Sequence, residues 1–362
     1  MYITAFMNAS GDTYGLPIDS ILILVVKRVG EILLTTPAIR AFRKAFPKAT
    51  IDVAVDAPMK DLLEDNPAIN HLILLDPSKT FDTLAWARRI RKRRYDLTVD
   101  FLANPRSAFL SLASGARLRI GLDKRVRRRA YHRYIEPSPA AASYVPDVRL
   151  NAVRMLGYEP DGVAMDFFPS DKGRRAGEQR LTEAGIGSSD RFAAMAPLSM
   201  VPHKLWPPEH FAQVADILVR EHRLPVVLVG GPNEYHFLEE TRAHMAERPA
   251  ALLEFQDLNT MGYVLSRACC YIGNDSGVRH LASAVRIPTV TVFGPTNPRE
   301  WNELEDPRHP ALWKEVSCRA AKCYIDCPYG YQCLDLVTPA DVLEAVRPLL
   351  PEVTEDQQSA GQ

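Results

Sequence analysis

Short apolar runs alternate with amphipathic stretches along most of the chain. Residues 21–26 (ILILVV) are apolar throughout and rich in β-branched side chains, a pattern typical of a strand buried on both faces of a parallel sheet. Residues 32–46 follow with apolar positions at helical spacing and with Pro37 near the start, where a missing N–H costs least. A basic helix at about 83–94 and further strands are expected at 51–55, 71–75 and 97–102. This alternation predicts a doubly wound domain built from βαβ units.

The same alternation starts again in the second half of the chain. Residues 225–229 (PVVLV) form an expected strand that is closed by Gly230 and Gly231. The other expected elements are strands at 192–197, 270–273 and 288–293 and helices at 208–221, 234–247 and from 276. Two Rossmann-like, doubly wound α/β domains facing a cleft follow from this repetition. In such sheets, ligands bind beyond the carboxyl ends of the strands.

The pattern also gives the domain boundaries. We expect a flexible leader at 1–20, a first domain at 21–165, a linker at about 165–173 and a second domain at 174–338. An amphipathic helix at 339–350 and a polar tail at 351–362 complete the chain.

Composition narrows the class of protein. The chain has 362 residues, 46% of them hydrophobic, which is enough for two domain cores. Its 44 acidic and 44 basic residues balance, so the global charge predicts no nucleic-acid partner. No apolar run approaches the roughly 20 residues that span a bilayer, and the N-terminal residues lack the pattern of a secretory signal. We therefore expect a cytoplasmic protein.

Local charge is uneven, because residues 88–133 are strongly basic and only Asp96, Asp100 and Asp123 oppose them. The basic residues are Arg88, Arg89, Arg91, Lys92, Arg93, Arg94, Arg106, Arg117, Arg119, Lys124, Arg125, Arg127, Arg128, Arg129 and Arg133. A run of charge is usually a solvated face, but this density indicates an anionic partner, either a phosphorylated lipid-linked acceptor or an acidic membrane surface. Nucleic acid is not expected, because aromatic interleaving is sparse and no nucleic-acid motif occurs.

Residues 273–282 (GNDSGVRHLA) carry the most informative pattern for function. A strand turns into a helix here, and a helix N-terminus is a ready anion site. Gly277 lets backbone N–H groups approach a ligand, and His280 lies one turn into the helix. An ordinary capped helix with a core histidine is the alternative. The candidate ligand contacts of this segment and of the FGPT run at 293–296 are Asn274, Asp275, Ser276, Gly277, His280 and Thr296.

These two segments resemble the donor-binding signature of glycosyltransferase family nine, whose members include the bacterial ADP-heptose:lipopolysaccharide heptosyltransferases. The resemblance covers about residues 21–350. It implies a GT-B fold in which the first domain binds the acceptor and the second binds the nucleotide sugar. It also implies that the final helix crosses back to the first domain. The implied partners are a nucleotide-diphosphate sugar and an anionic glycolipid, with peripheral contact at the inner-membrane surface.

Two further loops of the second half are similar to family elements. Residues 197–207 (PLSMVPHKLWP) resemble the phosphate-contacting loop, so Lys204 and Ser199 are candidate diphosphate contacts, against the alternative of a solvated lysine. The family usually has glycine where this chain has Leu198, which puts close backbone approach in doubt. Gly231 and Glu234 follow the strand at 225–229, and the resemblance implies a ribose contact for Glu234; a surface carboxylate is the alternative.

In the first half, residues 27–37 (KRVGEILLTTP) resemble the family element that carries the general base. The family has aspartate where this chain has Glu31, and the preceding loop is about two residues shorter. Glutamate can perform the same proton transfer, whereas a carboxylate that only complements the helix dipole is the alternative. Arg28, Thr35, Arg106 and Arg125 are the candidate acceptor contacts.

The chain has no Asp-x-Asp pair, which metal-dependent glycosyltransferases commonly use, so inverting transfer without a metal cofactor is expected. Four cysteines, Cys318, Cys323, Cys327 and Cys333, lie close together near the end. Their spacing fits neither zinc ribbons nor ferredoxins, which leaves structural or reducible thiols or a metal or iron–sulfur site.

The sequence therefore predicts an inverting, metal-independent glycosyltransferase that moves a heptose or similar sugar from an ADP-sugar to an anionic lipopolysaccharide-core-type acceptor. Two rivals remain open. One is a sugar-nucleotide epimerase of the same architecture, and the other is a catalytically silent module that binds a nucleotide sugar.

Overall fold

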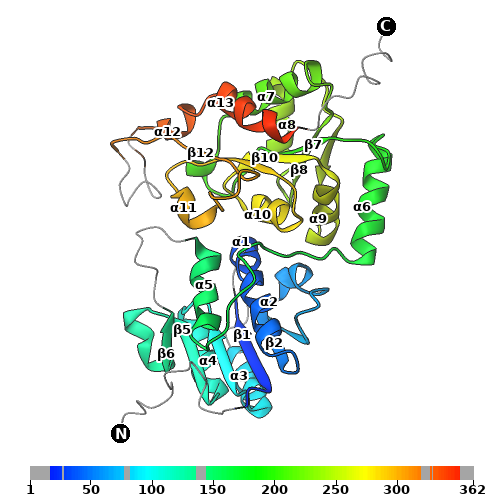
Figure 1. Ribbon diagram of the computed structural model, residues 1–362. Coiled ribbons are helices and arrows are strands. Elements are labelled where there is room, and N and C mark those ends of the chain that lie inside the picture. Colours follow the sequence, from blue (N-terminus) through cyan, green and yellow to red (C-terminus); the bar gives the residue numbers. More distant parts are fainter. Residues whose placement is uncertain are drawn as a thin grey trace. The chain divides into compact units, whose positions relative to one another are not determined.

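The computed structural model describes residues 17–26, 28–76, 82–135, 144–318, 327 and 329–350 (Figure 1). The chain forms two compact units, Met1–Phe168 and Pro169–Gln362. The boundary falls inside the stretch 165–173, where the linker was expected. Residues 1–16 of the expected leader and the tail at 351–362 lie outside the described residues.

The first unit is built on a six-stranded parallel sheet in the order β3-β2-β1-β4-β5-β6. Its strands are β1 (Ser20–Leu24), β2 (Thr50–Asp56), β3 (His71–Leu75), β4 (Leu97–Asp100), β5 (Leu118–Leu122) and β6 (Arg133–Ile135). Its α-helices are α1 (Val29–Leu33), α2 (Thr36–Ala45), α3 (Asp82–Arg93), α4 (Pro105–Ser114) and α5 (Val145–Arg154). Two 3₁₀ helices, η1 (Ala57–Leu62) and η2 (Arg125–Ala130), follow β2 and β5.

The apolar run that predicted the first strand lies at the centre of this sheet. In β1, Ile23 pairs with Val53 of β2 on one side and with Val99 of β4 on the other, and all three side chains are fully buried. Helices α3 and α4 cover one face of the sheet through a shared apolar cluster. Burial on both faces explains why the strand sequence is continuously apolar rather than alternating.

The single helix expected at 32–46 is two helices, α1 and α2, which is a correction to the sequence-based prediction. Pro37 cannot donate a backbone hydrogen bond and its ring crowds the preceding turn. The hydroxyl of Thr35 donates to the carbonyl of Glu31 at 2.8 Å, and that of Thr36 donates to the carbonyl of Leu33 at 2.7 Å. Side chains thus satisfy carbonyls that the interrupted helix leaves open.

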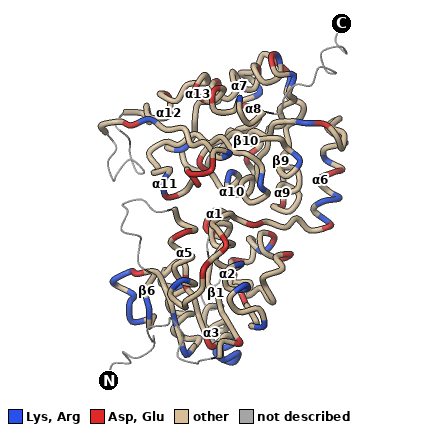
Figure 2. The backbone as a smooth tube through the Cα atoms, viewed as in Figure 1, with Lys and Arg blue, Asp and Glu red and all other residues tan. Residues whose placement is uncertain are grey.

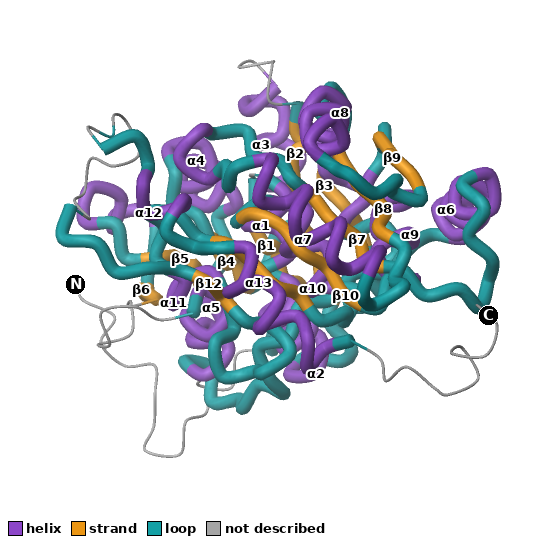
Figure 3. Tube along the Cα trace, turned by 90° about the horizontal axis from the view of Figure 1, so that it is seen from above, coloured by secondary structure: helices purple, strands orange, loops and turns teal. Residues whose placement is uncertain are grey.

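The second unit contains another six-stranded parallel sheet, in the order β12-β11-β10-β7-β8-β9. Its strands β7, β8, β9, β10 and β12 are labelled in Figure 3. Its strands are β7 (Ala193–Ala196), β8 (Val226–Gly230), β9 (Ala251–Glu254), β10 (Cys270–Asn274), β11 (Thr289–Val292) and β12 (Ala311–Leu312). Its α-helices are α6 (Asp171–Glu183), α7 (Pro208–Arg220), α8 (Tyr235–His244), α9 (Leu258–Arg267), α10 (Gly277–Ala284), α11 (Pro298–Trp301), α12 (Gln332–Asp335) and α13 (Pro339–Val346). The 3₁₀ helices are η3 (Pro202–Lys204) and η4 (Arg347–Leu349).

Helix contacts in this unit depend on specific small and polar residues. A Cβ on Gly173 of α6 would lie 2.8 Å from the Cβ of Asn259 at the start of α9, so only glycine permits this helix pair to pack so closely. Thr338 and Asp341 form a capping box at the start of α13. That helix, which was expected to return to the first domain, packs against α7 and contacts β11 within the second unit.

No helix in the described part of the chain is long and apolar enough to cross a membrane. Both sheets together confirm the predicted α/β class with two Rossmann-like, doubly wound units.

Candidate active site

The candidate donor residues of the second unit share one edge of its sheet. Strands β11, β10, β7 and β8 are neighbours and run parallel, so the loops that leave their carboxyl ends meet at that edge. Ser199 and Lys204 follow β7, Gly231 and Glu234 follow β8, Asp275, Ser276, Gly277 and His280 follow β10, and Thr296 follows β11. Four loops separated by up to about a hundred residues are thereby brought together.

Lys204 and Asp275 form an ion pair across two of these loops. The Lys204 Nζ donates to Asp275 Oδ2 at 2.5 Å, and the side-chain exposures are 24% for the lysine and 4% for the aspartate. The backbone N–H of Asp275 donates to the carbonyl of Val292 at the end of β11. The lysine ammonium is therefore held at the sheet edge, where a diphosphate can exchange with a carboxylate as its counter-ion.

Asn274, a candidate ligand contact, is fully buried and joins two parts of the loop that follows β7. Its Oδ1 accepts from the Trp206 backbone N–H at 3.1 Å, and its Nδ2 donates to the Leu198 carbonyl at 3.3 Å. The indole N–H of Trp206 donates in turn to the Val337 carbonyl at 2.8 Å. The structure thus gives Asn274 the task of fixing the lysine-bearing loop.

The Leu198 side chain points into the domain. It is 2% exposed and lies against Gly230, where its Cδ2 would be 3.3 Å from a Cβ on that glycine. The leucine at this position thus fills space between β7 and β8, and Gly230 provides the room for it.

Glu234 sits just before α8 and closes the glycine turn after β8. Its Oε2 accepts the backbone N–H of Gly231 at 2.6 Å, and burial raises the pKa of its carboxyl. The hydrogen bond uses one carboxylate oxygen, which leaves the second oxygen available to a hydroxyl donor.

The start of α10 and the loop after β11 hold buried hydroxyl groups. Ser276 is the N-cap residue, but its side chain makes no capping hydrogen bond and interacts instead with the buried Tyr271 hydroxyl. The Oγ1 of Thr296 is buried without a partner among the described residues. Because a buried hydroxyl is normally hydrogen-bonded, Thr296 marks a position that a polar ligand would complete. Tyr271 was not found from sequence, since it lies inside an apolar strand.

His280 is 4% exposed and lies on the inner side of α10 beside a buried cation. The Arg279 Nη2 is 3.0–3.1 Å from the two ring nitrogens of His280 and donates to the Trp301 carbonyl at 2.6 Å. Arg279 Nη1 also donates to Asn302 Oδ1 at 3.0 Å. Sequence reasoning missed Arg279, because an arginine on a polar-looking helix gives no signal of burial.

In the first unit, Glu31 is engaged by an arginine that sequence reasoning also missed. Arg149 of α5 is 3% exposed and pairs through Nη2 with the Glu31 carboxylate. Its Nη1 donates to the Glu31 carbonyl at 2.6 Å and to the Thr35 hydroxyl at 2.7 Å. Burial lowers the pKa of Arg149, and the Glu31 charge acts in the opposite direction. One guanidinium thereby fixes both the carboxylate and the turn between α1 and α2.

The remaining candidate acceptor residues lie at the carboxyl edge of the first sheet. Arg28 is the exposed N-cap residue of α1, and Arg125 is exposed at the start of η2. Arg106 donates to Asp56 Oδ1 at 3.3 Å and to the Asp76 carbonyl at 3.0 Å. These arginines follow three different strands.

The loop after β4 is shaped by a buried aspartate. Asp100 Oδ1 accepts from the backbone N–H groups of Leu102 and Ala103 at 2.9 Å, and its Oδ2 accepts from the Tyr131 hydroxyl at 2.7 Å. Burial raises the pKa of Asp100, while these hydrogen bonds act against that shift. Ala103 adopts a positive φ of 47°, and the Arg127 guanidinium donates to its carbonyl at 3.0 Å.

Of the four clustered cysteines, Cys323 lies outside the described residues. Cys318, Cys327 and Cys333 line one small hollow together with Pro295 and Tyr331. Among the described residues no group of three or more His, Cys, Asp or Glu side chains is placed to hold a metal ion.

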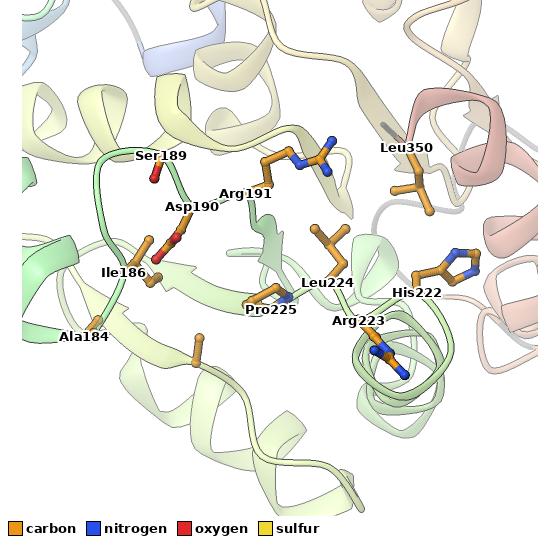
Figure 4. Close-up of a pocket in the computed structure, with 12 residues that line it drawn as sticks. Ala184, Ile186, Ser189, Asp190, Arg191, His222, Arg223, Leu224, Pro225 and Leu350 are labelled. Carbon is orange, nitrogen blue, oxygen red and sulfur yellow. The ribbon is translucent and has the colours of Figure 1, made fainter. Parts of the chain in front are cut away.

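A cavity of about 320 Å³ lies at the opposite, amino edge of the second sheet (Figure 4). Arg191 and Pro225, which line it, come just before β7 and β8, and Ile186, His222 and Leu350 complete much of its wall. It is therefore separate from the candidate donor loops.

Two Rossmann-like units, each with its loops gathered at the carboxyl edge of a parallel sheet, form a GT-B fold. A family model described as glycosyltransferase family 9 (heptosyltransferase) matches residues 83–326, which is more than half of the chain. The chain therefore belongs to glycosyltransferase family 9.

Relatives and solved structures agree with this membership. Lipopolysaccharide heptosyltransferase 3 of Escherichia coli is 27% identical over 341 residues, covering 90% of this chain and 97% of that protein. A family 9 glycosyltransferase of Veillonella parvula has a similar structure, with a TM-score of 0.79, 22% identity, and coverage of 91% of this chain and 97% of that chain. For the Escherichia coli ADP-heptose lipopolysaccharide heptosyltransferase II the TM-score is 0.74 at 20% identity, with coverage of 91% and 98%.

Proposed function

We propose that this enzyme transfers a heptose or similar sugar from an ADP-sugar to an anionic lipopolysaccharide-core-type acceptor, with inversion and without a metal cofactor. The observation that carries the donor part is the carboxyl edge of the second sheet, where the Lys204–Asp275 ion pair and the buried Thr296 hydroxyl, which has no partner among the described residues, lie on loops that follow neighbouring strands. The family and the named relatives support the sugar and the acceptor class. They favour transfer over the rival epimerase and the silent binding module.

The proposed chemistry is a direct displacement at the anomeric carbon of the donor sugar. Glu31 accepts the proton of the acceptor hydroxyl, and the acceptor oxygen bonds to the anomeric carbon as the bond to the β-phosphate oxygen breaks. ADP leaves with the bonding electron pair. Lys204 and the N-terminus of α10 stabilise the charge that develops on the leaving diphosphate. Ser199, Gly277 and Thr296 supply further hydrogen bonds, and Glu234 binds the ribose. Asn274 and His280 hold the loop and helix that carry these contacts.

Arg28, Arg106 and Arg125 would bind the anionic acceptor in this scheme. Thr35, also a candidate from the sequence, is fully buried and its hydroxyl is hydrogen-bonded to the Glu31 carbonyl and to Arg149, so it fixes the α1–α2 turn instead. Arg149 acts on Glu31 as a positioning residue, because its guanidinium fixes the carboxylate and the α1–α2 turn together. A lipid-linked acceptor places the reaction at the cytoplasmic surface of the inner membrane.

A thermal-shift panel of ADP, UDP, GDP and CDP tests the donor assignment. Selective stabilisation by ADP is expected, because the proposed donor is an ADP-sugar. At a hundred times its dissociation constant, a ligand adds about 2.7 kcal/mol to stability. Lys204→Met should abolish most of this shift, whereas Lys172→Met on α6 serves as the matched control and should leave it unchanged. Stabilisation by UDP alone would reject the ADP-sugar, and an undiminished shift in Lys204→Met would reject the role of that lysine.

Transfer assays with ADP-heptose should give equal rates with and without EDTA; loss of activity in EDTA would contradict the metal-independent mechanism.

A further inference from the structure

Exposed apolar side chains of the first unit gather on three successive helices, α3, α4 and η2. In the described part of this unit six large apolar residues are exposed: Leu84, Phe109, Leu112, Val126, Tyr158 and Phe168. Four of them lie on α3, α4 and η2, with exposures of 51% for Leu84, 42% for Phe109, 53% for Leu112 and 92% for Val126. Val126 is almost completely exposed although a polar residue would serve the same turn.

These three elements are neighbours. Helices α3 and α4 pack against each other and share the apolar cluster that covers one face of the first sheet. Helix α4 also contacts η2, where Ala108 and Ala130 belong to a second buried cluster. Leu110, Ser111 and Ser114 are buried on the inner side of α4, so Phe109 and Leu112 form its outward face between α3 and η2. The outward face of a short surface helix is normally polar, which makes this one unusual.

Basic residues flank the apolar face on both sides. Helix α3 ends in Arg88, Arg89, Arg91, Lys92 and Arg93, and η2 with its flanks carries Lys124, Arg125, Arg127, Arg128 and Arg129. Figure 2 shows the resulting concentration of positive charge along the η2–β6 segment. Asp123 forms an ion pair with Arg128 and also interacts electrostatically with Arg125. Lys124 and Arg129 are exposed and have no ion pair among the described residues.

We propose that the outward face of α3, α4 and η2, defined by Leu84, Phe109, Leu112, Val126, Lys124 and Arg129, docks on an anionic phospholipid bilayer. Apolar side chains at such a face enter the boundary between headgroups and acyl chains, while the surrounding cations contact lipid phosphates. Long basic side chains can reach the lipid phosphates while their aliphatic stems lie along the apolar surface of the protein. A soluble polyanion would use the cations but has no need of the apolar residues. The inference deepens the proposed function and rests on it for the position of the lipid-linked acceptor.

Co-sedimentation of the full chain with lipid vesicles tests this surface. One set of vesicles is pure phosphatidylcholine and the other contains phosphatidylglycerol as well; neither contains a glycolipid, so acceptor binding cannot account for the result. We expect binding only to the anionic vesicles. The triple variant F109S/L112S/V126S should lose most of this binding, whereas L304S/L336S should bind like the unsubstituted chain. The control changes Leu304 and Leu336, which are exposed in the second unit at 45% and 49%.

The contribution of the basic residues to vesicle binding is tested by a second matched pair of variants. K124A/R129A should weaken vesicle affinity roughly 30-fold, because each basic residue near an anionic surface contributes about one kcal/mol. K172A/R175A removes the same charge from the exposed start of α6 and should have little effect. Retained vesicle binding in both F109S/L112S/V126S and K124A/R129A would overturn the proposal, as would equal loss in the control variants.

The thermal shift with ADP separates failure of this proposal from failure of the proposed function. A normal shift in F109S/L112S/V126S shows that the variant is folded and that its donor site is intact, so its vesicle binding reports on the surface alone. Vesicle binding by a chain that gives no shift with any nucleotide would support the docking surface and reject the donor assignment. No vesicle binding by an unsubstituted chain that responds to ADP would overturn the docking surface.

Discussion

At the scale of single residues, the candidate base and the candidate diphosphate contact are each held by an ion pair. Glu31 is held by the buried Arg149, and Lys204 is held by the nearly buried Asp275. A buried charge pair contributes less to stability than its geometry suggests, because desolvation offsets most of the attraction. Its stronger effect is to fix positions: Arg149 contacts the Glu31 carboxylate, the Glu31 carbonyl and the Thr35 hydroxyl at once. Both pairs therefore hold a candidate functional side chain in one orientation.

Glu31→Gln should reduce turnover by about 100-fold or more, because proton transfer by a positioned base contributes about 10²–10⁴-fold. Glutamine keeps the size of the side chain and can still accept a hydrogen bond from Arg149. The stabilisation by ADP should stay near that of the unsubstituted enzyme, since the proposed donor residues lie in the other unit. Single-turnover transfer and thermal shift measure the two effects. Undiminished turnover would remove Glu31 from the role of base.

At the scale of elements, the loops that leave parallel strands are fixed by buried polar side chains rather than by packing alone. The loop after β4 is held by Asp100, whose oxygens accept from two backbone N–H groups and from the Tyr131 hydroxyl. The loop after β7 is held in the same way by Asn274, through Trp206 and Leu198. A fixed loop keeps the basic residue that it carries or leads into, Lys204 or Arg106 at the start of α4, at a defined place on the sheet edge.

Tyr131→Phe should lower the free energy of unfolding by about 2 kcal/mol, because it removes a hydrogen bond to a buried carboxyl group. Tyr134→Phe is the matched control. The Tyr134 hydroxyl donates to the Arg128 carbonyl at 3.2 Å in an exposed position, so its loss should cost less than about 0.5 kcal/mol. Urea titration of both variants measures the difference. Equal stability of the two would show that the Asp100 loop does not depend on Tyr131.

At the scale of the whole molecule, the charged candidate site residues lie at the carboxyl edges of the two sheets, and the buried apolar residues form the cores around those sheets. One buried titratable group nevertheless lies at the edge strand of the second unit. His309 is 5% exposed, and its Nδ1 lies 2.9 Å from the Thr289 hydroxyl. Burial, with Arg308 and Arg279 acting in the same direction, lowers the pKa of His309 to about 4, although Asp306 opposes the shift.

This histidine makes the stability of the molecule sensitive to mild acid. The unfolded chain binds the proton below about pH 6.5 and the folded chain only near pH 4. Its contribution is therefore complete above pH 6.5 and is lost as the pH falls to 4, by about 3 kcal/mol. The variant His309→Asn should lose that much less stability over this range. Urea unfolding of both proteins at pH 7 and pH 4.5 measures how much stability each loses on acidification. An equal loss in both would contradict the assignment to His309.

Much of the fold and part of the site were predictable from local sequence. Apolar runs such as 21–26 and 225–229 identified central strands, because burial on both faces leaves no room for polar residues. The edge strands β6 and β9 were missed, since a strand that is paired on one side only lacks that signal. The inner strand β5 (LRIGL) was missed as well, because an arginine and a glycine interrupt its apolar run. The positions of Lys204, Asp275 and Glu31 were found from motifs, but their partners were not.

The sequence by itself determined the class of fold, the family and the loops that carry chemistry, because periodicity and turn residues act over a few neighbouring positions. Only the tertiary structure decided which side chains meet. Arg149 reaches Glu31 across 118 positions of sequence, and Lys204 reaches Asp275 across 71. It also decided that the outward face of α4 is apolar beside the basic η2. Such contacts depend on the order of strands in a sheet, and long-range pairing leaves no local pattern in the chain.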